Sequence, residues 1–218
     1  MIALVRYMFT VLLLSQRYLA PLLLFVGLTA VLTNSDAGPL TASYAAVAGV
    51  MLLSSAWLTM ALIGLEDPPH RSIVVVSAGS HRRALLGSVA TATVSCLLLT
   101  VAGLLLPLVF GSHTVHPADL VLGTEAQLTC AFTGIAIGLV CSRLVFRHQG
   151  YALVVALLLL LAVMLGKGVS PVNIMLTNLQ QATSSANVLG STGVLVAAAA
   201  VLLVVGTAVT HAVTVRKS

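Results

Sequence analysis

Charged side chains are scarce in this chain. Asp, Glu, Lys and Arg make up 7% of its 218 residues, whereas a soluble domain carries about 25%. Hydrophobic residues make up 59%. A chain of this length then has too little polar material to cover a water-exposed surface. This composition excludes an ordinary soluble domain and indicates an integral membrane protein.

Three further absences exclude particular functions. The cysteines Cys96, Cys130 and Cys141 all lie inside apolar runs, so we expect neither a disulfide framework nor a cysteine metal site. The net charge of +5 comes from scattered basic residues without interleaved aromatics, which argues against nucleic acid as a partner. The nearest match to a phosphate-binding loop, AVMLGKGV at 162–169, lacks the first glycine and has no hydroxyl after Lys167. We therefore expect no ATPase activity and no bound cofactor in this chain.

Six apolar runs are long enough, or nearly long enough, to cross a membrane. A helix needs about 20 mainly apolar residues to cross about 30 Å of hydrocarbon. The runs lack the in-out alternation of a barrel, so we expect an all-α integral membrane protein that forms a single transmembrane domain. The first and fifth runs are short, and would have to thin the bilayer or pack on protein. The predicted spans are 19–33, 44–65, 84–110, 120–142, 151–166 and 191–212.

Basic residues predict the orientation of these spans. Six crossings place both termini on one side, and cytoplasmic loops are enriched in Lys and Arg. With cytoplasmic termini, nine of the 10 basic residues lie inside and Lys167 alone lies outside. We therefore expect a multi-pass protein with both termini in the cytoplasm. The nine inner residues are Arg6, Arg17, Arg71, Arg82, Arg83, Arg143, Arg147, Arg216 and Lys217.

The first 18 residues are apolar but carry a polar stripe. Arg6, Thr10 and Arg17 fall within about 40° of one another around a helix, at 100° per residue. Such a stripe suits a helix in the cytoplasmic interface, with arginine near phosphates and apolar residues facing the acyl chains. Pro21 favours a break before the first span, because proline fits the first turn of a new helix. The alternative is that residues 1–18 form an irregular start of that span.

Charges crowd together in one connection, EDPPHRSIVVVSAGSHRR at 66–83. Asp67 can cap a helix, Pro68 fits its first position, and Gly79 suits a left-handed cap at its end. We expect a short helix between these signals, although its β-branched centre favours a strand. Ser80 can then cap the third span. The alternative is a plain loop whose arginines only determine topology.

Three segments flank the predicted spans in a characteristic order. They are MIALVRYMFTVLLLSQRYLAP (1–21), GLEDPPHRSIVVVSAGSHRRALLG (64–87) and GKGVSPVNIMLTNLQQATSSANVLG (166–190). In this order the chain resembles the permease subunits of type-2 ATP-binding-cassette (ABC) exporters, including bacterial haem-export permeases of similar length. That family has an interfacial connecting helix, six spans, a cytoplasmic coupling helix between spans two and three, and an outer re-entrant segment before the last span. The resemblance covers nearly the whole chain and implies a protein of the cytoplasmic membrane of a bacterium.

The resemblance also implies partners. Residues 67–78 would dock as the coupling helix in a groove of a separate ATPase, which binds ATP and Mg. ATP-driven closure of two ATPases would then move spans two and three as rigid levers. A second permease, either another copy or a related chain, would complete the pore within membrane lipid. The implied ATPase contacts are Glu66, Asp67, His70, Arg71, Ile73, Val74 and Val75.

Polar residues inside the spans are candidates for a translocation path. Glu125 is the one acid within a predicted span, and intramembrane carboxylates are candidates for gates or proton sites. It lies about 8 Å from the outer end of its span, so a hydrated interfacial acid is the alternative. Span two, which the resemblance places near the path, carries Ser54, Ser55, Trp57 and Thr59. Such walls suit an amphipathic or lipid-like small molecule or peptide.

Residues 170–190 form the predicted outer gate segment. Ser170 and Pro171 fit a helix cap and first position, and apolar residues follow at helical spacing. The resemblance implies that this segment dips into the bilayer and closes the exit, whereas a simple surface helix is the alternative. The candidate gate residues are Asn173, Met175 and Thr177.

Two weaker motifs carry less information. His113, His116 and Asp119 have a spacing that suits a metal, but a solvated loop is the simpler interpretation and we expect no metal site. Gly134 and Gly138 form G-x-x-x-G, which permits close contact between helices. Packing within the chain is favoured over dimerisation, because small residues recur throughout these spans.

Together these patterns predict the membrane subunit of an ATP-driven exporter. An ion-coupled secondary carrier is the main alternative. It is disfavoured, because a single carboxylate near the outer end of a span provides few groups for ion coupling. A membrane scaffold or assembly subunit that transports nothing is a further alternative.

Overall fold

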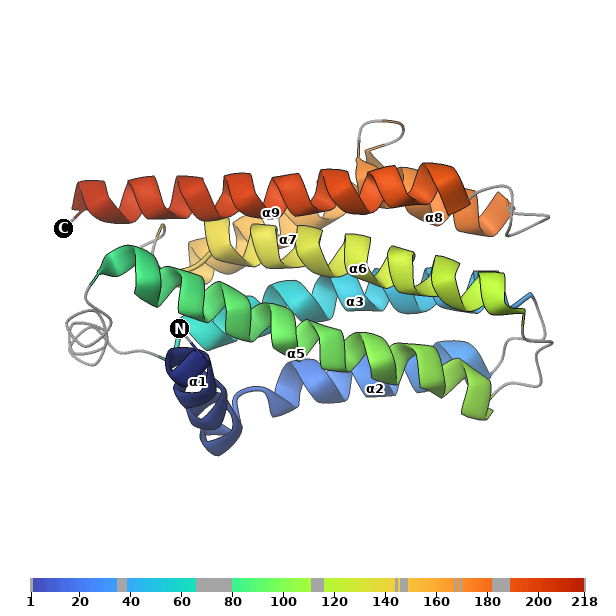
Figure 1. The fold of residues 1–218 in the computed structure, drawn as a ribbon, viewed down its shortest axis with the longest axis horizontal. Coiled ribbons are helices and arrows are strands. Elements are labelled where there is room, and N and C mark those ends of the chain that lie inside the picture. Colours follow the sequence, from blue (N-terminus) through green and yellow to red (C-terminus); the bar gives the residue numbers. More distant parts are fainter. Residues whose placement is uncertain are drawn as a thin grey trace.

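The chain folds into α-helices throughout the part that the structure describes. This computed structural model describes residues 2–34, 39–65, 80–110, 116–143, 145, 149–166, 168, 170–181 and 189–217. Over these residues it contains eight helices and no strand (Figure 1), which confirms the all-α prediction. The helices are α1 (Ile2–Ser15), α2 (Leu19–Asn34), α3 (Leu40–Ile63), α5 (His81–Phe110), α6 (Pro117–Val140), α7 (Gln149–Leu165), α8 (Pro171–Gln181) and α9 (Leu189–Lys217).

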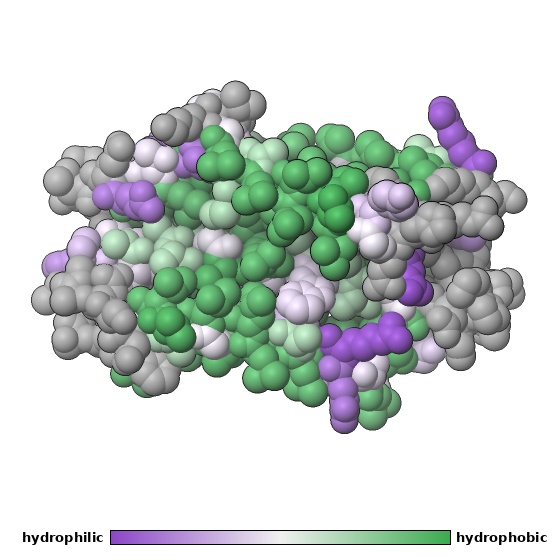
Figure 2. Space-filling model, turned by 180° about the vertical axis from the view of Figure 1, so that it is seen from behind, coloured by the Kyte–Doolittle hydropathy of each residue, from purple (hydrophilic) through white to green (hydrophobic). Residues whose placement is uncertain are grey.

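Several of these helices suit a membrane. Helices α3, α5, α6 and α9 are each long and apolar enough to cross one. Helices α1 and α2 meet the same criterion together, although they are bent by 76°, and α7 is apolar but shorter. Figure 2 shows hydrophobic residues covering much of the middle of one face, with hydrophilic residues toward its two ends and at its lower edge, right of the centre. The chain is therefore a multi-pass helical membrane protein with four or five spans by length and composition.

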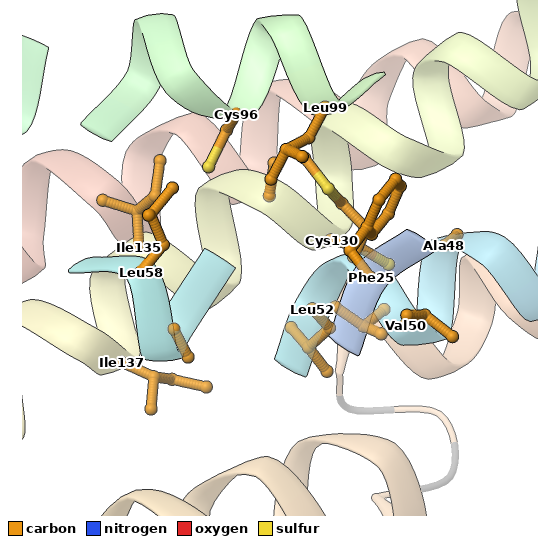
Figure 3. Close-up of a cluster of buried hydrophobic side chains, with 14 of the residues drawn as sticks. Phe25, Ala48, Val50, Leu52, Leu58, Cys96, Leu99, Cys130, Ile135 and Ile137 are labelled. Atoms are coloured by element: carbon orange, nitrogen blue, oxygen red, sulfur yellow. The ribbon is translucent and has the colours of Figure 1, made fainter. Parts of the chain in front are cut away.

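The centre of the bundle is the contact between α3 and α6. Buried residues make up 67% of the apolar window of α3 and 61% of that of α6, against 17% for α9. Helices α2 and α5 pack on one side of this pair, whereas α8 and α9 pack on the other. Figure 3 shows Phe25 of α2, Leu52 of α3, Leu99 of α5 and Cys130 of α6 in one cluster of buried side chains. Helix α9 lies at the outside, and most of its surface is left for lipid or a partner.

Helix α1 lies across one end of the bundle (Figure 1). Its polar stripe is exposed, as shown by Arg6 and Thr10, while Met8 and Leu12 on its other face are buried. The chain turns sharply after Ser15, and Gln16 takes the left-handed φ of 56° that this corner requires. The break favoured by the proline at position 21 is thus present, and that proline lies in the first turn of α2.

We call the end of the bundle that carries α1 the terminal end. The last turn of α3, the first turn of α5 and the C-terminal end of α9 all lie there (Figure 1). At the start of α5, the Ser80 Oγ accepts a hydrogen bond from the backbone N–H of Arg83 at 3.2 Å, so the predicted cap is confirmed. The opposite, distal end carries the end of α5, the start of α6 and helix α8 (Figure 1).

Two glycines allow α3 and α6 to come into backbone contact. A Cβ atom at Gly134 would lie 2.6 Å from the backbone oxygen of Leu52. One at Gly138 would lie 2.7 Å from the backbone oxygen of Ala56. Because backbone atoms cannot move aside as a flexible side chain can, only glycine fits these two positions. The G-x-x-x-G motif therefore packs within the chain, as predicted.

The first testable prediction concerns this contact. Gly134→Ala should lower the free energy of unfolding by about 1–3 kcal/mol, because the added methyl group forces the two helices apart. Gly27→Ala is the matched control, since nothing lies within 4 Å of a Cβ at that helical position. The control should be neutral or stabilising by about 0.5–1 kcal/mol. Unfolding in detergent micelles, followed by circular dichroism, measures both. Equal stability of the two variants would contradict the backbone contact.

Candidate functional site

The predicted contacts with an ATPase cannot be placed, but the residues on either side of them can. Glu66, Asp67, His70, Arg71, Ile73, Val74 and Val75 lie outside the described residues. Just before them, Arg17 donates a hydrogen bond from Nη1 to the backbone oxygen of Gly64 at 2.9 Å. Arg17 belongs to the corner between α1 and α2, and Gly64 directly follows α3. This bond ties the N-terminal segment to the beginning of the connection between α3 and α5.

The four candidate path residues of α3 do not line one surface. Ser54, Ser55 and Thr59 are almost completely buried, whereas Trp57 is 40% exposed. The Ser55 Oγ donates to the backbone oxygen of Leu52 at 3.1 Å, and the Thr59 Oγ1 donates to that of Ser55 at 2.8 Å. The Ser54 Oγ is buried and has no hydrogen-bond partner among the described residues. Two of these three hydroxyls are thus satisfied by their own helix rather than presented to a path.

Glu125 connects two helices near the distal end. This half-buried side chain of α6 accepts a short hydrogen bond at Oε2 from Thr192 Oγ1, near the start of α9. Thr192 is itself buried. A carboxylate has several lone pairs for hydrogen bonds, so it can hold this hydroxyl and still accept another donor. The arrangement makes Glu125 a latch between α6 and α9, a role that its position in the sequence alone does not reveal.

A buried amide that we did not predict lies at the centre of the bundle. Gln127 of α6 is fully buried, and neither polar atom of its side chain has a partner among the described residues. A Cβ atom at Gly103 of α5 would lie 2.6 Å from its Oε1, and 3.0 Å from Phe25 and Val47. Gln127 thus fills the space that the glycine leaves between four helices. The glutamine and the glycine are visible in the sequence, but their contact across 24 positions is not.

Helix α8 packs into the bundle by its apolar face. Val172, Met175 and Leu179 are buried, and α8 contacts α3, α6, α7 and α9. Asn173 donates from Nδ2 to the backbone oxygen of Met164 at 2.6 Å, which ties α8 to α7. Thr177 donates to the backbone oxygen of Asn173 at 2.8 Å. The apolar face, with Met175, therefore points toward other helices, and Asn173 links α8 to α7, whereas the Thr177 hydroxyl bonds within α8.

Two smaller predictions at the distal end can be compared with the structure. Helix α8 begins at Pro171 as expected, but the buried Ser170 Oγ has no partner among the described residues, so the predicted side-chain cap is wrong. Of the histidine motif, His116 is exposed and Asp119 is buried, while His113 lies outside the described residues. Within the described ranges, no group of three His, Cys, Asp or Glu side chains could hold a metal.

A cavity of about 450 Å³ opens at the terminal end. It lies between the start of α2, the last turns of α3, the turn after α6 and the start of α7. Arg17, Trp57 and Arg143 are among its lining residues. The structure therefore separates Trp57 from the buried serines of the same helix and places it at the wall of a cavity that Arg17 and Arg143 also line.

Comparison of the chain with protein-family models, with curated proteins and with solved structures finds no match. The residues and their geometry are therefore the basis for the functional proposal below.

The latch between α6 and α9 generates the second prediction. Thr192→Val removes the hydroxyl that Glu125 accepts and should lower the free energy of unfolding by about 1–2 kcal/mol. Thr207→Val in the same helix is the control, because the Thr207 hydroxyl donates to the backbone of its own helix at 2.8 Å. Its cost should stay below about 0.5 kcal/mol, as for substitutions away from special features. A double-mutant cycle with Glu125→Ala, which leaves no side-chain acceptor for the hydroxyl, isolates the pair and is read by unfolding in micelles. A coupling energy near zero would show that the latch contributes no stability.

Proposed function

We propose that this chain is the membrane-spanning subunit of an ATP-driven exporter of the type-2 ABC kind. The hydrogen bond from Arg17 to Gly64 is the observation that carries the proposal. It joins the corner that follows the crosswise helix α1 to the residue at which α3 passes into the connection with α5. A motor that pushes on this connection would act on α1, α3 and α5 together.

The lever in this proposal is α3. Its apolar window is the most buried of the four long helices, and it meets α6 through backbone contact at two glycines. A close-packed contact of this kind transmits displacement instead of absorbing it. A push at the terminal end of α3 would then reach the distal end, where Glu125 and Thr192 hold α9 against α6. Opening of that latch, together with movement of α8 and its residues Asn173, Met175 and Thr177, would release cargo.

The motor is a separate subunit. Because the chain lacks a phosphate-binding loop, ATP and Mg would bind to a partner ATPase, and residues 67–78 would dock in its groove. This chain would be neither an ATPase nor a nucleic-acid-binding protein.

In this proposal six helices cross the membrane, and α2 and α7 are the two short spans. These helices have 16 and 17 residues, or about 24–26 Å at 1.5 Å per residue. They fall short of about 30 Å of hydrocarbon by a few ångströms, which local thinning of the bilayer can accommodate. With this count both termini lie in the cytoplasm, and the protein belongs to the cytoplasmic membrane of a bacterium. The arginines of the described terminal end, Arg6, Arg17, Arg82, Arg83, Arg143 and Arg216, then all face the cytoplasm.

The working unit would contain two permeases, either two copies or two related chains. Helices α7 and α9 expose apolar side chains such as Leu158, Val201 and Val204. In a membrane these faces meet lipid or a second permease. A path formed between two such apolar surfaces suits an amphipathic or lipid-like small molecule or peptide.

The third prediction tests the motor connection. A tagged chain that lacks residues 67–78 should insert in the membrane but lose the ATPase that co-purifies with the full chain, identified by its phosphate-binding loop. The control replaces residues 111–115, in the connection at the distal end, with an equal length of Gly and Ser. This control should retain the ATPase. Retention by the deletion variant would contradict the proposal, and continued transport by that variant would favour an ion-coupled carrier.

The fourth prediction tests the orientation. Cys96, Cys130 and Cys141 are all buried, so the unmodified chain should react little with a membrane-impermeant maleimide. In intact spheroplasts, Ser112→Cys should be labelled, whereas Ser77→Cys should be labelled only after the membrane is permeabilised. The reverse pattern would place residues 66–79 outside the cell and remove the basis for a cytoplasmic motor.

A further inference from the structure

The described wall of the cavity at the terminal end includes positively charged side chains. Among its described lining residues, two carry charge, and both are arginines, Arg17 and Arg143. They come from the corner before α2 and from the turn after α6. A guanidinium group has five N–H donors in a planar fork. Arg17 uses Nη1 for the backbone oxygen of Gly64, and this bond holds its fork at the cavity wall.

Helix dipoles do not decide the sign of this cavity. The starts of α2 and α7 lie at its wall, and each helix start carries about half a positive charge. The end of α3 and the turn after α6 also lie there, and each helix end carries about half a negative charge. These contributions oppose one another. Among the described lining residues, the formal charges are those of the two arginines, and both are positive.

The rest of the wall is apolar or amphipathic. Met60, Leu153 and Trp57 lie along it. Leu153 is 60% exposed, so the cavity is continuous with the apolar outer surface of α7. Tryptophan is enriched where a membrane meets water, because its ring is apolar and its N–H is polar. An occupant of this cavity thus meets both arginine side chains and apolar side chains.

We propose that this cavity binds the headgroup of an anionic phospholipid from the leaflet at the terminal end. Arginine pairs with phosphate through two parallel hydrogen bonds, which lysine cannot reproduce. The volume of about 450 Å³ falls within the range of about 300–1,000 Å³ for small-molecule sites. The acyl chains leave the cavity along Leu153 and the outer surface of α7. A zwitterionic lipid is disfavoured, because its choline cation would approach two guanidinium groups of the same sign.

This inference goes beyond the proposed export function, because lipid binding needs neither an ATPase nor transport. The phosphate would bridge Arg17 and Arg143, and so join the corner before α2 to the turn between α6 and α7. Arg17 already holds the end of α3 through Gly64. Bound lipid would thus hold four helices at the end where a motor would act.

The fifth prediction uses Trp57, the single tryptophan of the chain, as a reporter at the site. Brominated lipids quench tryptophan fluorescence on contact. In micelles of the full chain, brominated phosphatidylglycerol should reach half-quenching at an about tenfold lower mole fraction than brominated phosphatidylcholine, equivalent to about 1.4 kcal/mol. The double variant Arg17→Ala/Arg143→Ala should lose this selectivity. The control Arg82→Ala/Arg83→Ala removes two exposed arginines from the same end and should keep it.

A further variant and a further condition distinguish the possible results of this quenching experiment. Arg143→Ala alone leaves the Arg17 bond to Gly64 in place and should still weaken the selectivity, so a folding defect from the loss of Arg17 cannot explain the result. Equal quenching by both lipids in the unmodified chain overturns the proposal. Equal loss of selectivity in both double variants also overturns it, because that result indicates diffuse surface charge. Inorganic phosphate at millimolar concentration should leave the selectivity unchanged. If phosphate abolishes it, the ligand is soluble phosphate and not a lipid.

Discussion

The contact between the backbones of α3 and α6 is the constraint on which the rest of the bundle depends. In a bilayer no hydrophobic force draws apolar helices together, so association relies on close packing and on polar bonds between helices. Gly134 and Gly138 provide that packing at the centre, and the other long helices are arranged around the resulting pair. Three other glycines serve similar contacts: Gly123 receives the ring of Tyr44, Gly103 receives Gln127, and Gly206 of α9 lies against Ala136. Small residues thus determine where each helix can lie.

Among the described residues, hydrogen bonds between helices are fewer than these packing contacts, and two of them lie toward opposite ends of the bundle. The latch from Glu125 to Thr192 lies toward the distal end, and the bond from Arg17 to Gly64 lies at the terminal end. Between them, most described hydroxyls donate to the backbone of their own helix, as Thr59, Thr91 and Thr133 do. The buried hydroxyls of Thr29 and Ser54 are exceptions, and the buried amide of Gln127 likewise has no partner among the described residues. An unpaired buried amide costs about 1–3 kcal/mol, which makes this position costly for stability alone.

Local patterns were sufficient to predict the helices and several of their ends. Long apolar runs predicted them, and Ser80 and Pro171 marked two of their starts. The candidate site was predicted less well, because its contacts join residues far apart in the chain. Glu125 pairs with Thr192, and Arg17 and Arg143 line one cavity, although the members of each pair lie far apart in the sequence. No periodic pattern in the sequence predicts either arrangement. Ser54 and Trp57 are three positions apart on one helix, yet one is buried and the other faces outward, because the neighbouring helices decide which side is covered. Hydropathy reports how apolar a helix is, but not which face meets protein.

The hydroxyls along α5 give this helix a mechanical character different from that of α3. Ser88, Thr91, Thr93, Ser95 and Thr100 all donate to the backbone oxygen four residues earlier. Bonds of this kind compete with the helix's own hydrogen bonds and favour bending, and Pro107 removes one more bond near the distal end. Helix α3 carries fewer such bonds and is clamped along α6. Of the two helices on either side of this connection, α5 therefore has the features that favour bending and α3 those that oppose it, so a shared displacement at their common end would bend α5 more than α3.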